Sequence, residues 1–248
     1  MKRILPVLLL LFGCAGQAVQ SGDVQARKRS SATVHTELGA GYYSRGQYAV
    51  ALSELGEATR ADPSYAPAYN VLGLVYMAIR ENDNARDNFE RALSISPRDS
   101  DINNNYGWFL CQTGHEKESI GKFLKALSNP LYATPEKADL NAGICSEKAG
   151  DDAKAEGYYR EALRLHPGLG QANLGLARIS YRMGRYAQAK TYLVNSLQGT
   201  EPSAESLWLG IEIARKLGDP DSEADYATQL RNRFPDSQEA RDLLNGNG

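Results

Sequence analysis

Residues that carry chemistry are scarce in this chain. Of its 248 residues, three are histidines and three are cysteines. His35, His115 and His166 lie far apart, and no pair has the spacing of metal ligands or of a catalytic pair. The sequence also has no phosphate-binding loop and no serine in a nucleophile-elbow motif. We therefore expect no enzyme activity, no metal, no cofactor and no small-molecule substrate.

An excess of charge of one sign is also missing. The chain has 28 Lys and Arg residues against 30 Asp and Glu residues, and its formal net charge is −2. Nucleic-acid binding depends largely on neutralising phosphates, and the one basic run, residues 27–29, is short. The composition therefore argues against a nucleic-acid partner. With 42% hydrophobic and 23% charged residues, it is typical of a well-ordered protein of one or two domains.

Long hydrophobic runs are absent except at the N-terminus. Residues 1–3 carry positive charge, and residues 4–12 are apolar apart from Pro6. This run is much shorter than the ~20 residues that a spanning helix needs. A basic start followed by a short apolar run is typical of a secretory signal. The sequence thus predicts export.

The end of this signal resembles a bacterial lipobox. Residues 11–14 read Leu-Phe-Gly-Cys, in which the cysteine becomes the first residue and carries lipid; Phe12 departs from the small residue usual there. We expect residues 1–13 to be a lipoprotein signal peptide and Cys14 to be lipidated, and several acyl chains give stable anchoring. Ala15 is not the Asp that sorting rules associate with the inner membrane, which favours the periplasmic leaflet of the outer membrane. The alternative is a plain secreted protein in which Cys14 is incidental.

Residues 14–31 are small and polar, without apolar periodicity. They are predicted to form a lipidated flexible tether, with a root-mean-square reach of roughly 20–25 Å.

From residue 32 onward the sequence repeats with a period of 34. Leu38-Gly39 aligns with Leu72-Gly73, and later positions keep the same shift, including Ala51 with Ala85, Leu55 with Phe89, Ala58 with Ala92 and Pro63 with Pro97. This pattern is that of the tetratricopeptide repeat. The predicted domain covers 32–245, with repeats at approximately 32–65, 66–99, 100–135, 136–169, 170–202 and 203–235 and a cap at 236–245.

The residue types in this pattern explain the expected fold. Small residues let the two helices of a repeat approach closely, large residues fill the space between them, and proline ends the second helix. One repeat cannot bury its apolar face alone, so stacked neighbours supply the core. The sequence predicts an all-α, right-handed superhelical solenoid of six helix-turn-helix repeats with a C-terminal capping helix.

The two remaining cysteines fall in the first helices of consecutive repeats. Cys111 and Cys145 are 34 residues apart, and first helices of adjacent repeats are neighbours. An exported protein lies in a compartment where disulfides persist. We expect a disulfide between them; the alternative is a pair of buried, reduced thiols.

The positions of the first helices that do not pack on the second helices predict a partner-binding groove. These side chains suit an extended or helical peptide, and the amides of Asn70 and Asn104 repeat at one offset, suited to clamp a peptide backbone. The alternative is that Leu74, Met77 and Ile144 pack within the solenoid. The predicted groove residues are Tyr43, Asn70, Leu74, Met77, Asn104, Trp108, Leu140, Ile144, Leu174, Arg178 and Tyr181.

The whole chain resembles the type IV pilus biogenesis and stability lipoproteins, the PilF/PilW pilotin family. The most specific stretches are residues 104–111, 140–145, 209–211 and 229–237. The resemblance implies a scaffold that binds the pilus secretin and promotes its outer-membrane localisation and multimerisation. The alternative is a general outer-membrane or periplasmic assembly scaffold for another envelope complex.

Overall fold

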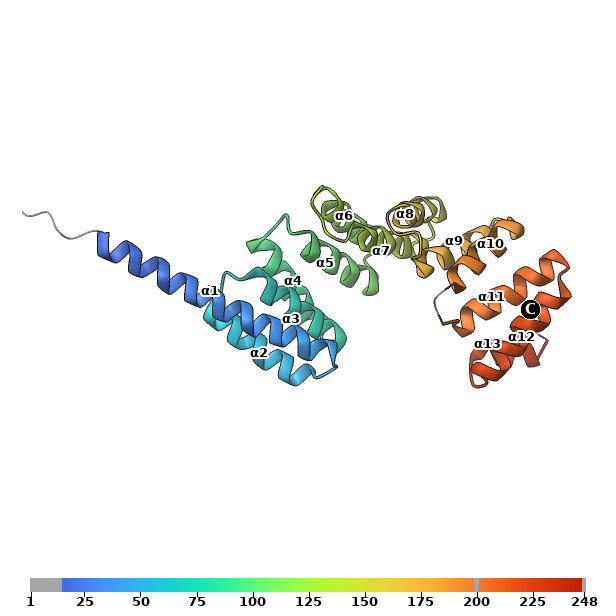
Figure 1. The fold of residues 1–248 in the computed structure, drawn as a ribbon, viewed down its shortest axis with the longest axis horizontal. Coiled ribbons are helices and arrows are strands. Elements are labelled where there is room, and N and C mark those ends of the chain that lie inside the picture. The colour runs from blue at the N-terminus through green and yellow to red at the C-terminus, as the bar shows by residue number, and fades with distance from the viewer. Residues whose placement is uncertain (1–14, 199–200, 247–248) are drawn as a thin grey trace, which may run out of the picture. The chain divides into compact units, whose positions relative to one another are not determined.

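The computed structural model describes residues 15–198 and 201–246, and within them it contains helices and short connections but no strand (Figure 1). The predicted signal peptide, residues 1–13, and the predicted lipid site, Cys14, lie outside the described residues. The chain divides after Pro97 into two compact units. In the described residues, no helix combines the length and the apolar character that a membrane span requires.

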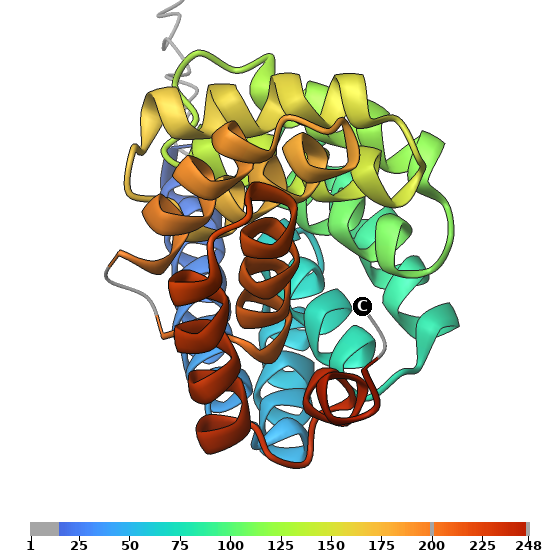
Figure 2. The ribbon, with the colours of Figure 1, turned by 90° about the vertical axis from the view of Figure 1, so that its right-hand side faces the viewer.

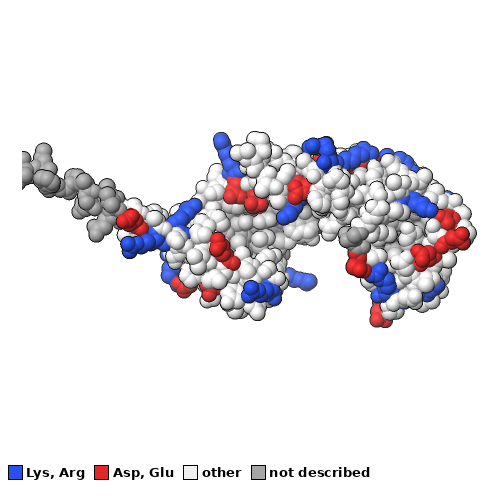
Figure 3. Space-filling view, viewed as in Figure 1, with Lys and Arg blue, Asp and Glu red and all other residues white. Residues whose placement is uncertain are grey.

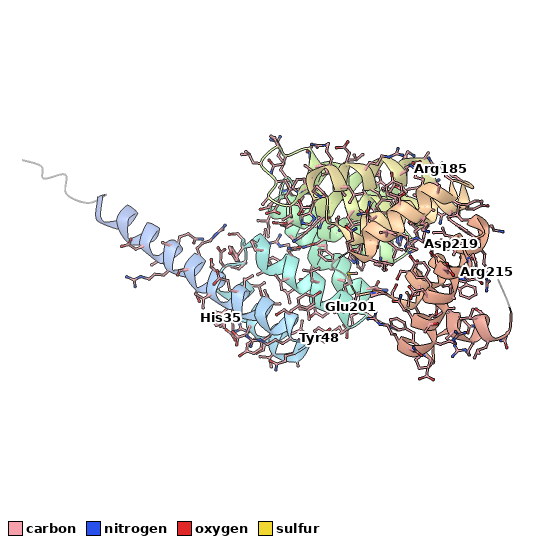
Figure 4. All side chains as sticks on the ribbon, turned by 45° about the vertical axis from the view of Figure 1, so that its right-hand side comes forward. His35, Tyr48, Arg185, Glu201, Arg215 and Asp219 are labelled. Atoms are coloured by element: carbon pink, nitrogen blue, oxygen red, sulfur yellow. A yellow bond between two sulfur atoms is a disulfide. The ribbon has the colours of Figure 1, made fainter. Side chains whose placement is uncertain are left out.

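The first unit contains two helix pairs. They are α1 (Ala15–Ser44) with α2 (Tyr48–Ala61), and α3 (Ala66–Ala78) with α4 (Asn82–Ile95). Its core includes Leu55 of α2 and Val75 of α3, both fully buried. A Cβ atom added to Gly39 of α1 would lie 2.6 Å from Cγ of Leu55, so only glycine allows the two helices to approach this closely. His35 of α1, labelled in Figure 4, pairs with Glu54 of α2, with Nδ1 of the histidine 2.8 Å from Oε2 of the glutamate.

The first helix begins earlier than predicted. The prediction that residues 15–31 form a flexible tether is therefore wrong. These residues continue α1, although every residue from Gly22 to Ser31 is exposed. They include no proline and several good helix formers, so the helix extends without a buried face to give it a period. Arg29 also ties the segment to the connection after α2, because its guanidinium lies 4.7 Å from the Tyr65 ring centroid and 3.6 Å from Asp62.

The second unit continues the alternation of first and second helices (Figure 2). Its helices are α5 (Ser100–Gln112), α6 (Glu116–Leu127), α7 (Pro135–Lys148), α8 (Asp152–Leu165), α9 (Gly170–Arg182), α10 (Tyr186–Leu197), α11 (Ala204–Leu217), α12 (Pro220–Arg233) and α13 (Gln238–Leu244). Gly150 and Gly184 lie in the turns of two of these pairs with φ of 78° and 72°, which disfavours other residues there. The first helices α5, α7, α9 and α11 contact one another in sequence.

Tyr159 shows how the pairs stack. It is fully buried on α8, and a Cβ atom at Gly143 of α7 or Gly175 of α9 would come within 2.6 Å or 2.4 Å of its ring. One aromatic side chain therefore fills the space both within its own repeat and against the next. At the C-terminal end of the described residues, α13 packs on α11 and α12 through Ala240 and Leu243. This helix lies where the C-terminal cap was predicted. The predicted all-α tetratricopeptide fold is confirmed.

Candidate functional site

In the first unit, the predicted groove residues are half-buried. Tyr43 lies near the end of α1, and Asn70, Leu74 and Met77 lie on α3, which contacts α1. Tyr43 packs on the core of the unit with its ring centroid 6.2 Å from that of Tyr48. Burial, and to a lesser extent Tyr48, raises the pKa of the Tyr43 hydroxyl. Each of these side chains keeps an accessible part, as a contact surface requires.

In the second unit, five of the seven predicted groove residues are half-buried and lie on successive first helices. They are Trp108 on α5, Ile144 on α7, and Leu174, Arg178 and Tyr181 on α9. Consecutive first helices contact each other, so these residues lie on neighbouring elements of one repeat stack. The first helices of this unit therefore present a set of partly accessible side chains, both apolar and polar.

Asn104 and Leu140 do not belong to an open groove, because they are only 7% and 8% exposed. The Asn104 amide oxygen accepts a hydrogen bond of 3.0 Å from Nδ2 of Asn141, which ties α5 to α7. The prediction that this amide is free to clamp a peptide is therefore wrong. Leu140 packs in a core cluster with Leu176 of α9. Both side chains contact the first helix of the following repeat. The repeat register alone does not tell such a side chain from one that faces solvent.

Cys111 and Cys145 join α5 to α7. Their sulfur atoms are 2.06 Å apart and their Cα atoms 5.8 Å apart, a Cα separation that suits a disulfide. Both are fully buried beside Phe123, and half-buried Trp108 packs on the same cluster. Nζ of Lys148 donates a hydrogen bond of 2.6 Å to the backbone oxygen of Cys111. The covalent link, the hydrogen bond and the apolar cluster hold these two first helices together.

Sequence reasoning missed Glu147, which organises an ion-pair cluster between α7 and α9. Arg178 donates to both Glu147 carboxylate oxygens, from Nε at 2.9 Å and from Nη2 at 2.8 Å. The Tyr159 hydroxyl donates to the same carboxylate at 2.8 Å, and Arg182 adds a bond of 3.0 Å. Arg178 is thus committed to an internal ion pair rather than free for a partner. Glu147 sits four residues after Gly143, the offset at which Met77 follows Gly73, so the register contained the signal.

A pocket of about 190 Å³ opens between α9 and α11. Two predicted groove residues, Arg178 and Tyr181, line it from α9, together with Arg182. From α11 the lining is made by Glu205, Trp208, Leu209 and Glu212, none of which was predicted. The sixth repeat matches the repeat pattern only loosely, and Trp208, one residue before Leu209-Gly210, is the feature of its sequence that could have indicated this lining.

On the face shown in Figure 3, basic and acidic side chains of the described residues are interspersed. This distribution matches the nearly balanced composition. It offers no extended basic surface on that face for a nucleic-acid backbone.

Asp139 on α7 gives a pH-dependent prediction. It is 7% exposed, and burial, followed by repulsion from Glu161, raises its pKa to about 6, although Arg164 acts in the opposite direction. As pH rises, the Asp139 carboxyl ionises at a lower pH in the unfolded chain than in the folded protein. The free energy of unfolding of the wild type therefore falls as pH rises from 3.8, the ordinary pKa of the carboxyl, to about 6, its pKa in the folded protein. We expect Asp139→Asn to stabilise the protein at pH 7 by up to about 3 kcal/mol and to have little effect below its ordinary pKa.

Urea unfolding followed by circular dichroism, at pH 7 and at a pH below 3.8, measures the difference in the free energy of unfolding between the wild type and Asp139→Asn. Asp87→Asn, an exposed site on α4, is the matched control and should change stability little at either pH. An Asp139→Asn variant no more stable than wild type at pH 7 contradicts the prediction.

Comparisons with known proteins agree with this architecture. Family models described as tetratricopeptide repeat match residues 36–100 and 147–198. The type IV pilus assembly protein PilF of Pseudomonas aeruginosa is 31% identical over 242 residues, which cover 96% of this chain and 96% of that protein. The solved structure of P. aeruginosa PilF has a TM-score of 0.83 at 30% identity and covers 88% of this chain and 99% of that one.

The crystal structure of PilW, a widely conserved type IV pilus biogenesis factor, has a TM-score of 0.79 at 35% identity, covering 86% of this chain and 98% of that one. The similarity to PilF extends over nearly the full length of both proteins. This chain therefore belongs to the PilF/PilW family of type IV pilus tetratricopeptide-repeat proteins.

Proposed function

We propose that this chain is a non-enzymatic outer-membrane lipoprotein scaffold for type IV pilus biogenesis, which binds the pilus secretin and promotes its localisation and multimerisation. The observation that carries the proposal is the 31% identity to PilF over 96% of both chains. The half-buried aromatic and aliphatic side chains on the first helices support a protein-binding role, because such side chains provide contact area on a rigid scaffold.

The anchor of the proposed scaffold is Cys14, held in the periplasmic leaflet by its acyl chains. Ala15, the next residue, begins α1. The helical segment 15–31 spans roughly 25 Å at the rise of an α-helix, so it holds the first repeat away from the lipid surface more stiffly than a coil does. The secretin is then engaged at a set distance from the membrane.

Complementation of a deletion strain tests the proposal. Wild-type protein should fractionate with the outer membrane and restore secretin multimers in that membrane. We expect Cys14→Ser to leave the outer-membrane fraction and to reduce those multimers, because it lacks the thiol that carries the lipid. A Cys14→Ser protein that stays in the outer membrane overturns the anchor, and multimers that form normally without any copy of this chain overturn the secretin role.

The surface that binds is tested in the same strain. Alanine replacement of Tyr43, Leu74, Met77 and Trp108 should lower secretin multimers, whereas replacement of exposed Leu124 and Val194 on second helices should not. Circular dichroism must show that the variants fold, because Trp108 also packs on the disulfide cluster. Normal multimers with the folded fourfold variant place the interface elsewhere. Capture of a different envelope protein instead of the secretin favours a general assembly scaffold.

A further inference from the structure

The pocket between α9 and α11 has the size of a site for one side chain. At about 190 Å³ it is smaller than the roughly 300–1,000 Å³ of sites for drug-sized ligands. Its lining combines an apolar residue, Leu209, with two aromatic residues, Tyr181 and Trp208. Both aromatic side chains are half-buried, so they keep accessible surface.

The arginines of the pocket are already engaged by carboxylates. Arg178 forms its bidentate pair with Glu147 and a further contact of 3.0 Å with Glu205. Arg182 contacts Glu147 at 3.0 Å and Asp152 at 2.6 Å. Because these guanidinium groups already have anionic partners, an incoming anion would have to displace an internal carboxylate. The pocket is therefore poorly suited to bind an anion.

Glu212 is in the opposite situation. It lines the pocket from α11 and has no ion pair of its own among the residues that the structure describes. The adjacent Arg215, labelled in Figure 4, is instead paired with Glu223 at 2.7 Å. Burial raises the pKa of the Glu212 carboxyl, although Arg215, Lys216 and the Tyr181 hydroxyl act in the opposite direction. A half-buried carboxylate without a cation within contact distance gains most from a cationic ligand.

We propose that this pocket accepts one basic side chain, lysine or arginine, from a protein partner, with its charged end on Glu212 and its methylene stem against Leu209 and Trp208. Long basic side chains combine an apolar stem with a charged end, which need an apolar and an anionic environment respectively. The lining offers these two environments side by side. The inference rests on the protein-binding part of the proposed function and on no particular partner.

Binding of short peptides to the full chain in detergent tests the proposal directly. The probes are acetyl-Ala-Lys-Ala-amide, acetyl-Ala-Arg-Ala-amide and acetyl-Ala-norleucine-Ala-amide, of which the last has an apolar stem without charge. The chain has two tryptophans, so the Trp108→Phe variant assigns the indole N–H signal of Trp208 in a proton–nitrogen NMR spectrum. We expect the Lys or Arg peptide to shift that signal at millimolar concentration and the norleucine peptide to bind at least about tenfold more weakly.

Glu212→Gln should weaken binding of the basic peptide about tenfold. Glu239→Gln makes the same charge change at a half-buried position on α13, outside the pocket lining, and should leave binding unchanged. Equal binding of the norleucine peptide, no binding of either basic peptide, or basic-peptide binding that survives Glu212→Gln overturns the proposal. Because this assay contains no secretin, its failure leaves the proposed function untouched. A failure of complementation likewise leaves the peptide result standing.

Discussion

Replacing Glu147 with glutamine is expected to lower the free energy of unfolding by about 3 kcal/mol or more. The Glu147 side chain is 12% exposed and that of Arg178 is 26% exposed, so water compensates the lost charge poorly. Glutamine keeps the volume of the side chain but leaves Arg178 without its bidentate acceptor, and weakens the acceptor of the Tyr159 hydroxyl. Urea unfolding followed by circular dichroism measures the loss.

Glu57→Gln is the matched control for this prediction. Glu57 pairs with Arg60 on α2, but their side chains are 50% and 70% exposed. Exposed pairs of this kind contribute about 0–1 kcal/mol, since solvent screens them and holding two long side chains costs entropy. Equal losses from the two variants contradict the view that Glu147 organises the α7–α9 contact.

The effect of Glu147 also has a defined pH dependence. Burial raises the pKa of its carboxyl, but the ion pairs with Arg178 and Arg182 and the Tyr159 hydrogen bond outweigh burial and hold the pKa below its ordinary value of 4.5. Such a group contributes its stability above that ordinary value and loses it as pH falls through the lower folded value. The difference between wild type and Glu147→Gln should therefore shrink in acid. If the stability difference between wild type and Glu147→Gln stays constant until Glu147 is fully protonated, the ionised carboxyl is not the cause of the stabilisation.

The repeat pattern was sufficient to predict the helix pairs because contacts within a pair recur at fixed offsets. Gly143 and Tyr159 face each other in one repeat as Gly73 and Phe89 do in another, and both contacts follow from the 34-residue period. The helical segment 15–31 could not be found in this way. It is exposed from Gly22 to Ser31, so no apolar period marks it, and its helical state depends on propensity and on contacts of Arg29 after α2.

The candidate site was only partly predictable for a related reason. The register places a residue on a first helix but does not say whether its side chain meets solvent or the next repeat, so Asn104 and Leu140 were misplaced. Glu147 occupies the same offset as Met77, yet its partner Arg178 lies 31 residues later, and a match between two long side chains depends on their three-dimensional geometry. Trp208 was missed because its repeat diverges from the pattern.

The disulfide gives the second large expected effect. Reduction of Cys111–Cys145 should lower the free energy of unfolding by about 3–4 kcal/mol in the chain-entropy model, because the bond closes a loop between residues separated by 34 positions. The link joins the first helices of two consecutive repeats, which otherwise hold together through packing and hydrogen bonds such as Asn141 to Asn104. Thermal or urea unfolding with and without reductant measures the loss.

A double variant, Cys111→Ala with Cys145→Ala, separates loss of the bond from side effects of the reductant. Its stability should be close to that of the reduced wild type and should not change when reductant is added, because no other bond remains between these positions. Thiol titration of the unfolded, unreduced protein gives the decisive measurement. If the link forms, neither cysteine titrates, since both sulfurs are consumed. If both titrate, the two residues act as small buried hydrophobic side chains, and the stability of the α5–α7 contact must come from Phe123, Trp108 and the hydrogen bonds around them.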